Sequence, residues 1–332
     1  MLLTIYPYNQ KVRTKTTDVK SILEQFFNLP VSLLGSGRLA IFLSLKLSGL
    51  SRRDHVLIPE FLSQCVLSII NQTGFPVKTF DKNTKAVLLF HELGYPQKID
   101  EVLKEAKERN LIVIEDCAHS FDSKYKNQNV GTFGDFSAFS FSKIFPTGMG
   151  GCLLSRNSEL QDQIKKLSQN SEKKINKLFG SWCNHISLNS YRGFLHPRIT
   201  EICYSQYQNF FSLPKKSSNL FPQSLTELKS IIKKRKDNYT LLKNNISEDF
   251  LIPDHDPDIT PNPLALPVFL PEKYLISIKK SLLAKNISAD ILHFDVNRNI
   301  FNPFYKKCLI LPCHQYVKEE DIENIVNSIK KI

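Results

Sequence analysis

This sequence of 332 residues lacks the marks of a membrane, secreted or metal-binding protein. No apolar run approaches the roughly 20 residues that cross a bilayer, and no basic segment precedes the apolar residues at the N-terminus. We therefore expect neither membrane insertion nor a signal peptide. The seven cysteines form no Cys-x-x-Cys pair, and the eight histidines show no ligand spacing. This predicts buried, reduced thiols in a cytoplasmic protein and no metal.

Two further classes are disfavoured by motifs that the chain does not contain. No Gly-x-Gly-x-x-Gly follows the first predicted strand, which argues against a Rossmann dehydrogenase. The formal net charge of +12 comes without a recognisable nucleic-acid module. Because lysine runs usually mark solvated surfaces, we expect no nucleic-acid partner. Attraction of a phosphorylated substrate stays open as a second interpretation of the charge.

What the chain does contain is an alternation of strand-like and helix-like segments. Residues 86–90 and 111–115 are apolar runs, typical of strands buried on both faces of a parallel sheet. This rhythm predicts an α/β fold with a mostly parallel, helix-covered sheet. The length predicts a second unit as well. We expect a large domain over residues 1–215, then a basic bridging helix near 223–245 that opens a smaller C-terminal α+β domain over 216–332.

An acid and a lysine stand out at the ends of two apolar runs. Asp116 follows the strand predicted over 111–115, and Lys143 follows the run over 136–141 and precedes a glycine cluster. Ligand sites of open α/β sheets lie at the carboxyl ends of the strands, so both side chains are predicted to face one crevice. Glu115, one residue earlier than Asp116, is predicted to face the opposite side of the sheet.

The same chain offers residues that suit an anion. Ser36, Gly37 and Arg38 open a predicted helix, and the N–H groups and dipole at a helix start favour a phosphate. Ser140 and Ser142 come just before the lysine and could add hydroxyl groups to the same site. We therefore predict a phosphate cradle upstream of, and next to, the lysine loop.

A lysine, a carboxylate and an anion site together form the residue set that pyridoxal phosphate (PLP) requires. The lysine forms a Schiff base with the aldehyde of the cofactor, and the carboxylate keeps its pyridine nitrogen protonated. His119, three residues after Asp116, is near enough in sequence to hydrogen-bond the cofactor or the acid. We therefore predict PLP as the cofactor, with Lys143, Asp116 and His119 as the catalytic residues.

Several motifs occur in a fixed order along the chain. They are Gly-Ser-Gly-Arg-Leu-Ala at 35–40, Glu-Asp-Cys-Ala-His at 115–119, Phe-Ser-Phe-Ser-Lys at 139–143, Gly-Met-Gly-Gly at 148–151 and Leu-Pro-Cys-His at 311–314. Together they resemble the DegT/StrS family of PLP-dependent sugar aminotransferases. The resemblance implies a fold-type-I aminotransferase, usually a homodimer with active sites at the subunit interface.

The resemblance also implies roles for single residues. Lys143 matches the Schiff-base lysine, Asp116 the partner of the pyridine nitrogen, and His119 a residue beside the cofactor ring. The phosphate is expected to be held by the helix start and the serines before the lysine: Ser36, Gly37, Arg38, Ser140 and Ser142. The chain departs from the family at Ser63, where an aromatic residue often stacks on the ring. Phe61 is our candidate substitute, and Asn219 our candidate for the asparagine that the partner subunit donates.

These observations predict an aminotransferase. The amino donor is expected to be an amino acid, glutamate in most relatives, and the acceptor a keto sugar that is nucleotide-linked by analogy with the family. Three alternatives stay open: a sugar dehydratase of the same family, a transaminase of a non-sugar keto substrate, and a binding or regulatory protein that kept the fold without turnover. The dehydratase branch typically replaces the lysine with histidine, so Lys143 disfavours it.

Overall fold

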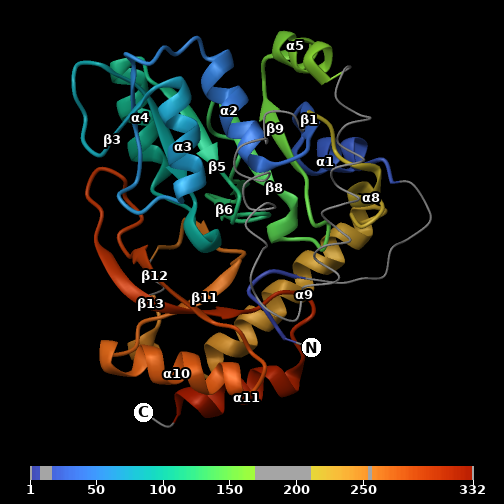
Figure 1. The fold of residues 1–332 in the computed structure, drawn as a ribbon, viewed down its shortest axis with the longest axis vertical. Coiled ribbons are helices and arrows are strands. Elements are labelled where there is room, and N and C mark those ends of the chain that lie inside the picture. Colours follow the sequence, from blue (N-terminus) through green and yellow to red (C-terminus); the bar gives the residue numbers. More distant parts are fainter. Residues whose placement is uncertain (1, 8–16, 169–210, 253–255, 331–332) are drawn as a thin grey trace.

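The computed structural model describes residues 2–7, 17–168, 211–252 and 256–330. Figure 1 shows a larger lobe built on one sheet and a smaller lobe in which helices cover a second sheet. The long helix α9 (Leu225–Asn244) runs between the two lobes, at the place where the sequence predicted a bridging helix. The mostly parallel, helix-covered α/β sheet of the larger lobe is also present as predicted.

The large sheet has seven strands in the order β1-β9-β8-β5-β4-β2-β3. Strands β8, β5, β4, β2 and β3 are parallel, whereas β9 is antiparallel to both β8 and β1. Strand β1 was missed by the sequence reasoning, because its four residues show no distinctive pattern. The strands are β1 (Val31–Leu34), β2 (His55–Leu57), β3 (Phe75–Val77), β4 (Thr84–Phe90), β5 (Ile112–Asp116), β8 (Phe136–Ser140) and β9 (Gly151–Ser155).

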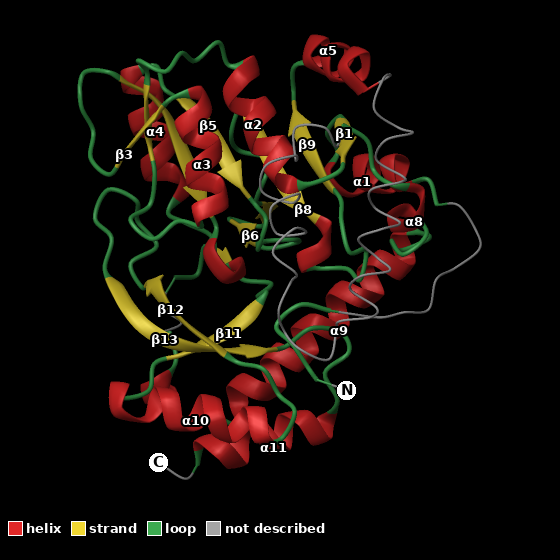
Figure 2. Ribbon diagram, in the orientation of Figure 1, coloured by secondary structure: helices red, strands yellow, loops and turns green. Residues whose placement is uncertain are grey.

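Both faces of this sheet are buried by helices (Figure 2). Alternate residues of β4 show the two-residue period of a strand: Val87 and Leu89 belong to one apolar cluster, Ala86 and Leu88 to the other. This explains why the run is apolar throughout. The helices of the lobe are α1 (Val19–Phe27), α2 (Gly37–Leu47), α3 (Gln64–Thr73), α4 (Ile99–Arg109), α5 (Ser158–Ser168) and the short α8 (Lys215–Ser218).

The smaller lobe contains an antiparallel sheet in the order β11-β13-β12, covered by two helices (Figure 2). Leu3 forms a bridge with Ile287, so the described N-terminal residues lie against this lobe. A division of the chain near residue 215 remains a proposal. The elements are β11 (Ala265–Val268), α10 (Glu272–Ala284), β12 (Asp290–Asp295), β13 (Tyr305–Pro312) and α11 (Glu319–Ile329). Three short strands form a further sheet, β10-β6-β7: β6 (Lys124–Tyr125), β7 (Gln128–Asn129) and β10 (Ile259–Thr260).

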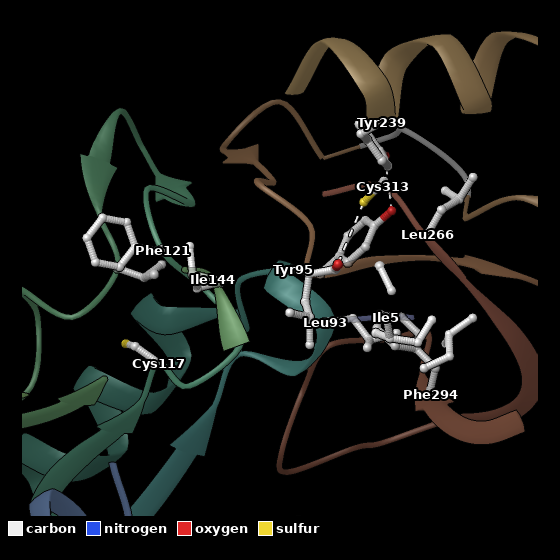
Figure 3. Packing of buried hydrophobic residues seen from close by; sticks show 14 of the residues in the cluster. Ile5, Leu93, Tyr95, Cys117, Phe121, Ile144, Tyr239, Leu266, Phe294 and Cys313 are labelled. Atoms are coloured by element: carbon white, nitrogen blue, oxygen red, sulfur yellow. Dashed lines mark hydrogen bonds between the residues drawn. The ribbon is translucent and has the colours of Figure 1, made fainter. Parts of the chain in front are cut away.

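The two lobes share a continuous apolar core. Tyr95, which follows β4, meets Tyr239 of α9 through their hydroxyl groups at 3.0 Å, and it packs edge-on against Phe294 of β12 (Figure 3). Both tyrosines are buried, so each hydroxyl satisfies the other inside the protein. This core fixes the smaller lobe close to the loop that carries Lys143.

The described cysteines carry free thiols. Cys117, Cys152, Cys308 and Cys313 are buried and Cys65 is partly exposed, whereas Cys183 and Cys203 lie outside the described residues. Across the described ranges, every helix is too short or too polar to cross a membrane.

The segment after β13 contains a buried neutral histidine, His314, which is 2% exposed. Its Nε2 donates to the carbonyl of Thr4 at 3.0 Å, and its Nδ1 accepts from the N–H of Tyr316 at 3.2 Å. A proton added at Nδ1 would face that N–H. Burial and the charge of Arg235 lower the pKa of His314 to about 3. The folded protein therefore holds this ring in its neutral form at physiological pH.

Because the folded protein holds His314 in its neutral form, we expect the protein to lose stability in mild acid. Between its unfolded pKa of 6.5 and its folded pKa of about 3, the unfolded chain binds one proton more than the folded chain. Stability is therefore complete above 6.5 and falls as pH decreases. Lowering the pH from 6.5 to about 5.5 should cost the wild type about 1 kcal/mol more than His314→Gln, measured by urea unfolding. An equal loss in both proteins would contradict the buried neutral ring.

Candidate active site

The carboxyl ends of β4, β5 and β8 lie next to one another at one edge of the large sheet. Asp116 pairs in register with Ala138 of β8, and Ser140 at the end of β8 pairs with Gly151. A single turn of 3-10 helix, η2 (Phe141–Lys143), follows β8 directly and places Lys143 at this edge. The strand-end positions that the sequence predicted for Asp116 and Lys143 are therefore the ones observed.

Lys143 is in contact with His119 at this edge. The Nζ of Lys143 lies 2.8 Å from the Nε2 of His119, and the Nδ1 of His119 accepts from the N–H of Leu93 at 3.2 Å. Burial and the positive charge of Lys143 lower the pKa of His119 well below its usual value, so the ring is neutral. A neutral ring that accepts at Nδ1 carries its proton on Nε2. The Nε2 of His119 and the Nζ of Lys143 are therefore hydrogen-bond partners at this edge of the sheet.

The carboxyl group of Asp116 is buried and has one recorded hydrogen bond to its side chain. It is 2% exposed, and its Oδ1 accepts from the N–H of Ala118 at 3.0 Å. Burial raises the pKa of Asp116, although the positive charge of Lys143 acts in the opposite direction. Burying a charge with a single neutral donor is costly. A bound group that presents a cationic N–H to Asp116 would therefore be favoured here.

Glu115 faces away from Asp116, as the alternation of a strand predicts. It is completely buried, and its Oε2 lies at hydrogen-bond distance, 3.0 Å, from the Nε2 of His91. Burial by itself would raise the pKa of Glu115, but the bond with His91 and the backbone donors hold it below its usual value. Five groups donate to this carboxylate or contact it: His91 Nε2, the N–H groups of Gly131, Phe133 and Gly134, and the Ser137 hydroxyl. Glu115 therefore organises the turn before β8.

One cluster of the described residues has the composition of a metal site: His91, Glu115 and Cys117, whose donor atoms lie within 4.8 Å of one another. Both nitrogens of His91 are already engaged, Nε2 with Glu115 and Nδ1 with the N–H of Gln97. Burial raises the pKa of the Cys117 thiol well above its usual value, which disfavours the thiolate that a metal needs. The cluster is therefore structural.

The predicted phosphate cradle lies at the start of α2. Ser36 is the N-cap, and its hydroxyl accepts from the N–H of Leu39 at 3.2 Å. Gly37 and Arg38 form the first turn, where backbone N–H groups precede the helical hydrogen bonds. Gly37 packs so closely on the end of β8 that an added Cβ would lie 3.1 Å from the Cβ of Ser140. This close packing brings the helix start next to the lysine loop.

The remaining predicted site residues differ in their positions. Ser142 lies in η2, half-buried, directly before Lys143. Phe61 stacks on His293 of β12 at a ring distance of 4.3 Å, with Tyr305 edge-on at 4.8 Å, so its recorded ring contacts are with the smaller lobe. Asn219 ends α8, and its side-chain oxygen is buried without a hydrogen-bond partner in the described chain. The roles of all three stay predictions.

These features fit PLP in their chemistry. An amine lies beside a neutral histidine, a buried carboxylate has a pKa raised by burial, and an 11-residue helix points its N-terminus at the same edge of the sheet. Sheet, lysine, acid and helix start together define the site class of a PLP-dependent transferase.

Comparison with known proteins gives the family. The model of the DegT/DnrJ/EryC1/StrS aminotransferase family matches residues 77–330, so the chain belongs to this PLP-dependent family. The resemblance predicted from the motifs is thereby confirmed.

Individual relatives are more distant. The chain is 29% identical to the GDP-perosamine synthase of Escherichia coli O157:H7 over 231 residues, 61% of each protein, which is less than two thirds of that relative's length. It is 26% identical to the UDP-4-amino-4,6-dideoxy-N-acetyl-beta-L-altrosamine transaminase of Helicobacter pylori over 276 residues, 76% of this chain and 67% of that protein.

A solved structure shares the fold. The PLP form of a protein described as a sugar aminotransferase, from Streptococcus pneumoniae, superposes with a TM-score of 0.66 at 17% identity. The match covers 97% of this chain and 93% of that one, and a structure of the pyridoxamine phosphate (PMP) form of the same protein also matches. The predicted fold type is therefore confirmed.

Proposed function

We propose that the protein is a PLP-dependent aminotransferase that moves an amino group from an amino acid, glutamate in the first instance, to a nucleotide-linked keto sugar. The observation that carries this proposal is the contact of Lys143 with the neutral ring of His119, at the sheet edge where β5 ends in the buried Asp116. The family and the names of the two nucleotide-sugar relatives support the substrate class.

The residues of the chain have separate tasks in this proposal. When bound, PLP supplies an electron sink that stabilises negative charge on the α-carbon of the donor. Lys143 provides the amine that holds the cofactor and then carries a proton to and from substrate carbon. Asp116 keeps a positive charge on the pyridine nitrogen, because an uncompensated buried carboxylate favours a cationic partner. His119 orients the Nζ of Lys143.

The phosphate of the cofactor is assigned to the start of α2. The backbone of Gly37 and Arg38 offers N–H groups at the positive end of the helix dipole, and Ser36 stabilises that end as its N-cap. Ser140 adds a hydroxyl from the neighbouring end of β8, and Ser142 another from η2. Phe61 is assigned as the aromatic cover of the cofactor ring, which requires it to leave its stacking contact with His293.

We further propose a homodimer in the cytoplasm. The homodimer rests on membership of the family, and Asn219 stays the candidate for the asparagine that a partner subunit donates. The free thiols of the described cysteines support a reducing compartment.

The proposed function is tested by spectroscopy on the purified full-length protein. Reconstitution with PLP should give the visible absorption band of a lysine-bound cofactor, and added glutamate should convert that band to the spectrum of PMP. A nucleotide-linked 4-keto sugar should then restore the original band. A protein that never forms the lysine-bound band would overturn the cofactor assignment. If glutamate converts the band to the PMP spectrum but no keto sugar restores it, the amino-group acceptor is a non-sugar keto compound instead.

A further inference from the structure

A buried arginine near the lysine loop has no acidic partner among its recorded contacts. Arg235 of α9 is 1% exposed, and its guanidinium donates to the side-chain oxygen of Gln315 at 2.9 Å and to the carbonyl of Pro263 at 3.2 Å. Its Nε is buried without a partner in the described chain. An apolar residue of similar size would avoid the cost of burying this charge. Its hydrogen bond to Gln315 is therefore the feature to examine.

Gln315 connects this arginine to the catalytic loop. Its Oε1 accepts from Arg235, and its Nε2 donates to the carbonyl of Ile144 at 3.1 Å. Because a guanidinium can only donate, Arg235 determines which end of the amide faces it. The NH₂ end is then directed at Ile144, the residue after Lys143. The arginine thus orients a donor toward the lysine loop.

Further hydrogen bonds fix the segment that carries Gln315. The side chain of Asn238, also on α9, donates to the carbonyls of His314 and Val317, on either side of Gln315. Ile144 is 1% exposed, so its carbonyl is buried, and Gln315 provides it with a side-chain donor. On the other side of the loop, the N–H of Leu93 holds His119, and His119 contacts Lys143. Gln315 and His119 therefore restrain the Lys143 region from two directions.

We propose that Gln315, oriented by the buried Arg235, is a positioning residue that holds the loop of Lys143 in the geometry needed to capture PLP. The proposal rests on the proposed function only for the identity of the captured group. The position of the smaller lobe is thereby coupled to the position of the catalytic amine, through one amide and one guanidinium. The closing motif that the sequence singled out at 311–314 ends directly before this residue.

The sharpest test is Gln315→Glu. Glutamate keeps the length of the side chain and an acceptor for Arg235, but the ionised group has no N–H for the carbonyl of Ile144. Backbone amides of residues 141–150 should exchange with deuterium about tenfold faster in the cofactor-free variant, the factor expected from one lost hydrogen bond. Borohydride trapping of PLP on Lys143, located by peptide mass spectrometry, should slow by a similar factor.

Two further variants separate positioning from general stability. Lys285→Met removes the bonds from Nζ to the Asn324 carbonyl and the Ser328 hydroxyl, within the smaller lobe. It should lower the thermal stability and leave both exchange in 141–150 and trapping on Lys143 at wild-type rates. Gln315→Met loses both hydrogen bonds of the amide and should behave as Gln315→Glu does. It replaces the glutamate variant as the test if that variant does not fold.

The outcomes are distinct. Wild-type exchange in 141–150 for a folded Gln315 variant would overturn the positioning role, and so would an equal slowing of trapping in Lys285→Met. If the wild type itself never traps PLP on Lys143, the proposed function fails. The exchange measurement still decides the positioning role in that case, because it needs no cofactor.

Discussion

Lys143→Ala is expected to lower the rate of transamination at least about 10³-fold, because the variant loses both the nucleophile and the carrier of the proton. The fold should persist. Lys143 is partly buried, and its recorded hydrogen bond is the one with His119, so the change should cost no more than about 1 kcal/mol of unfolding free energy. Rates with glutamate and a keto-sugar acceptor, measured beside urea unfolding, check both expectations.

The matched control is Lys82→Ala, an exposed lysine in the loop before β4. It should retain wild-type activity, which shows that loss of one positive charge from this basic protein is harmless. A Lys143→Ala protein with more than about a tenth of wild-type activity would contradict the assignment, since general acid–base groups contribute about 10²-fold or more.

Two adjacent acids on β5 are expected to respond in opposite ways to loss of their charge. Asp116→Asn should reduce activity about 10²-fold or more, because a neutral amide no longer stabilises a protonated pyridine nitrogen. Its stability should be unchanged or higher, since burial raises the pKa of Asp116 and the charge therefore costs free energy in the folded state.

Glu115→Gln should instead unfold the protein more easily, by about 3 kcal/mol. The carboxylate meets three backbone N–H groups, from Gly131, Phe133 and Gly134, as well as the ring of His91. An amide presents an NH₂ group to some of these donors and leaves them unsatisfied. Urea unfolding and PLP-saturated activity of both variants check the contrast. If Glu115→Gln were stable but inactive, the two carboxylates would have exchanged roles.

The site illustrates how far local pattern reasoning extends. Asp116 and Lys143 were predicted at the sheet edge because each follows an apolar run, and parallel strands end at the same edge. The opposite direction of Glu115 followed from the two-residue period of a strand. Strand β1 was missed because its partner, β9, lies more than a hundred residues later in the chain, and no local pattern marks that pairing.

Contacts between distant segments were beyond the sequence. The N–H of Leu93 fixes the proton of His119 on Nε2, yet Leu93 belongs to the turn after a different strand. Phe61 was proposed as the substitute for an aromatic residue at Ser63, and its ring packs on His293 of the smaller lobe, more than two hundred residues away. Neither pairing has a spacing that sequence reasoning could use, because the first depends on how the ends of β4 and β5 are aligned and the second on how the lobes meet.

The sequence by itself determined the class of chemistry, since residue type and strand-end position already specify an amine, an acid and a helix start at one edge. Tertiary structure decided how these groups are held. The neutral state of His119, the separate role of Glu115 and the reach of Gln315 to Ile144 all depend on burial and on partners from remote segments. Burial and long-range hydrogen bonds arise only when the chain is folded, so their effects on protonation and position are properties of the fold.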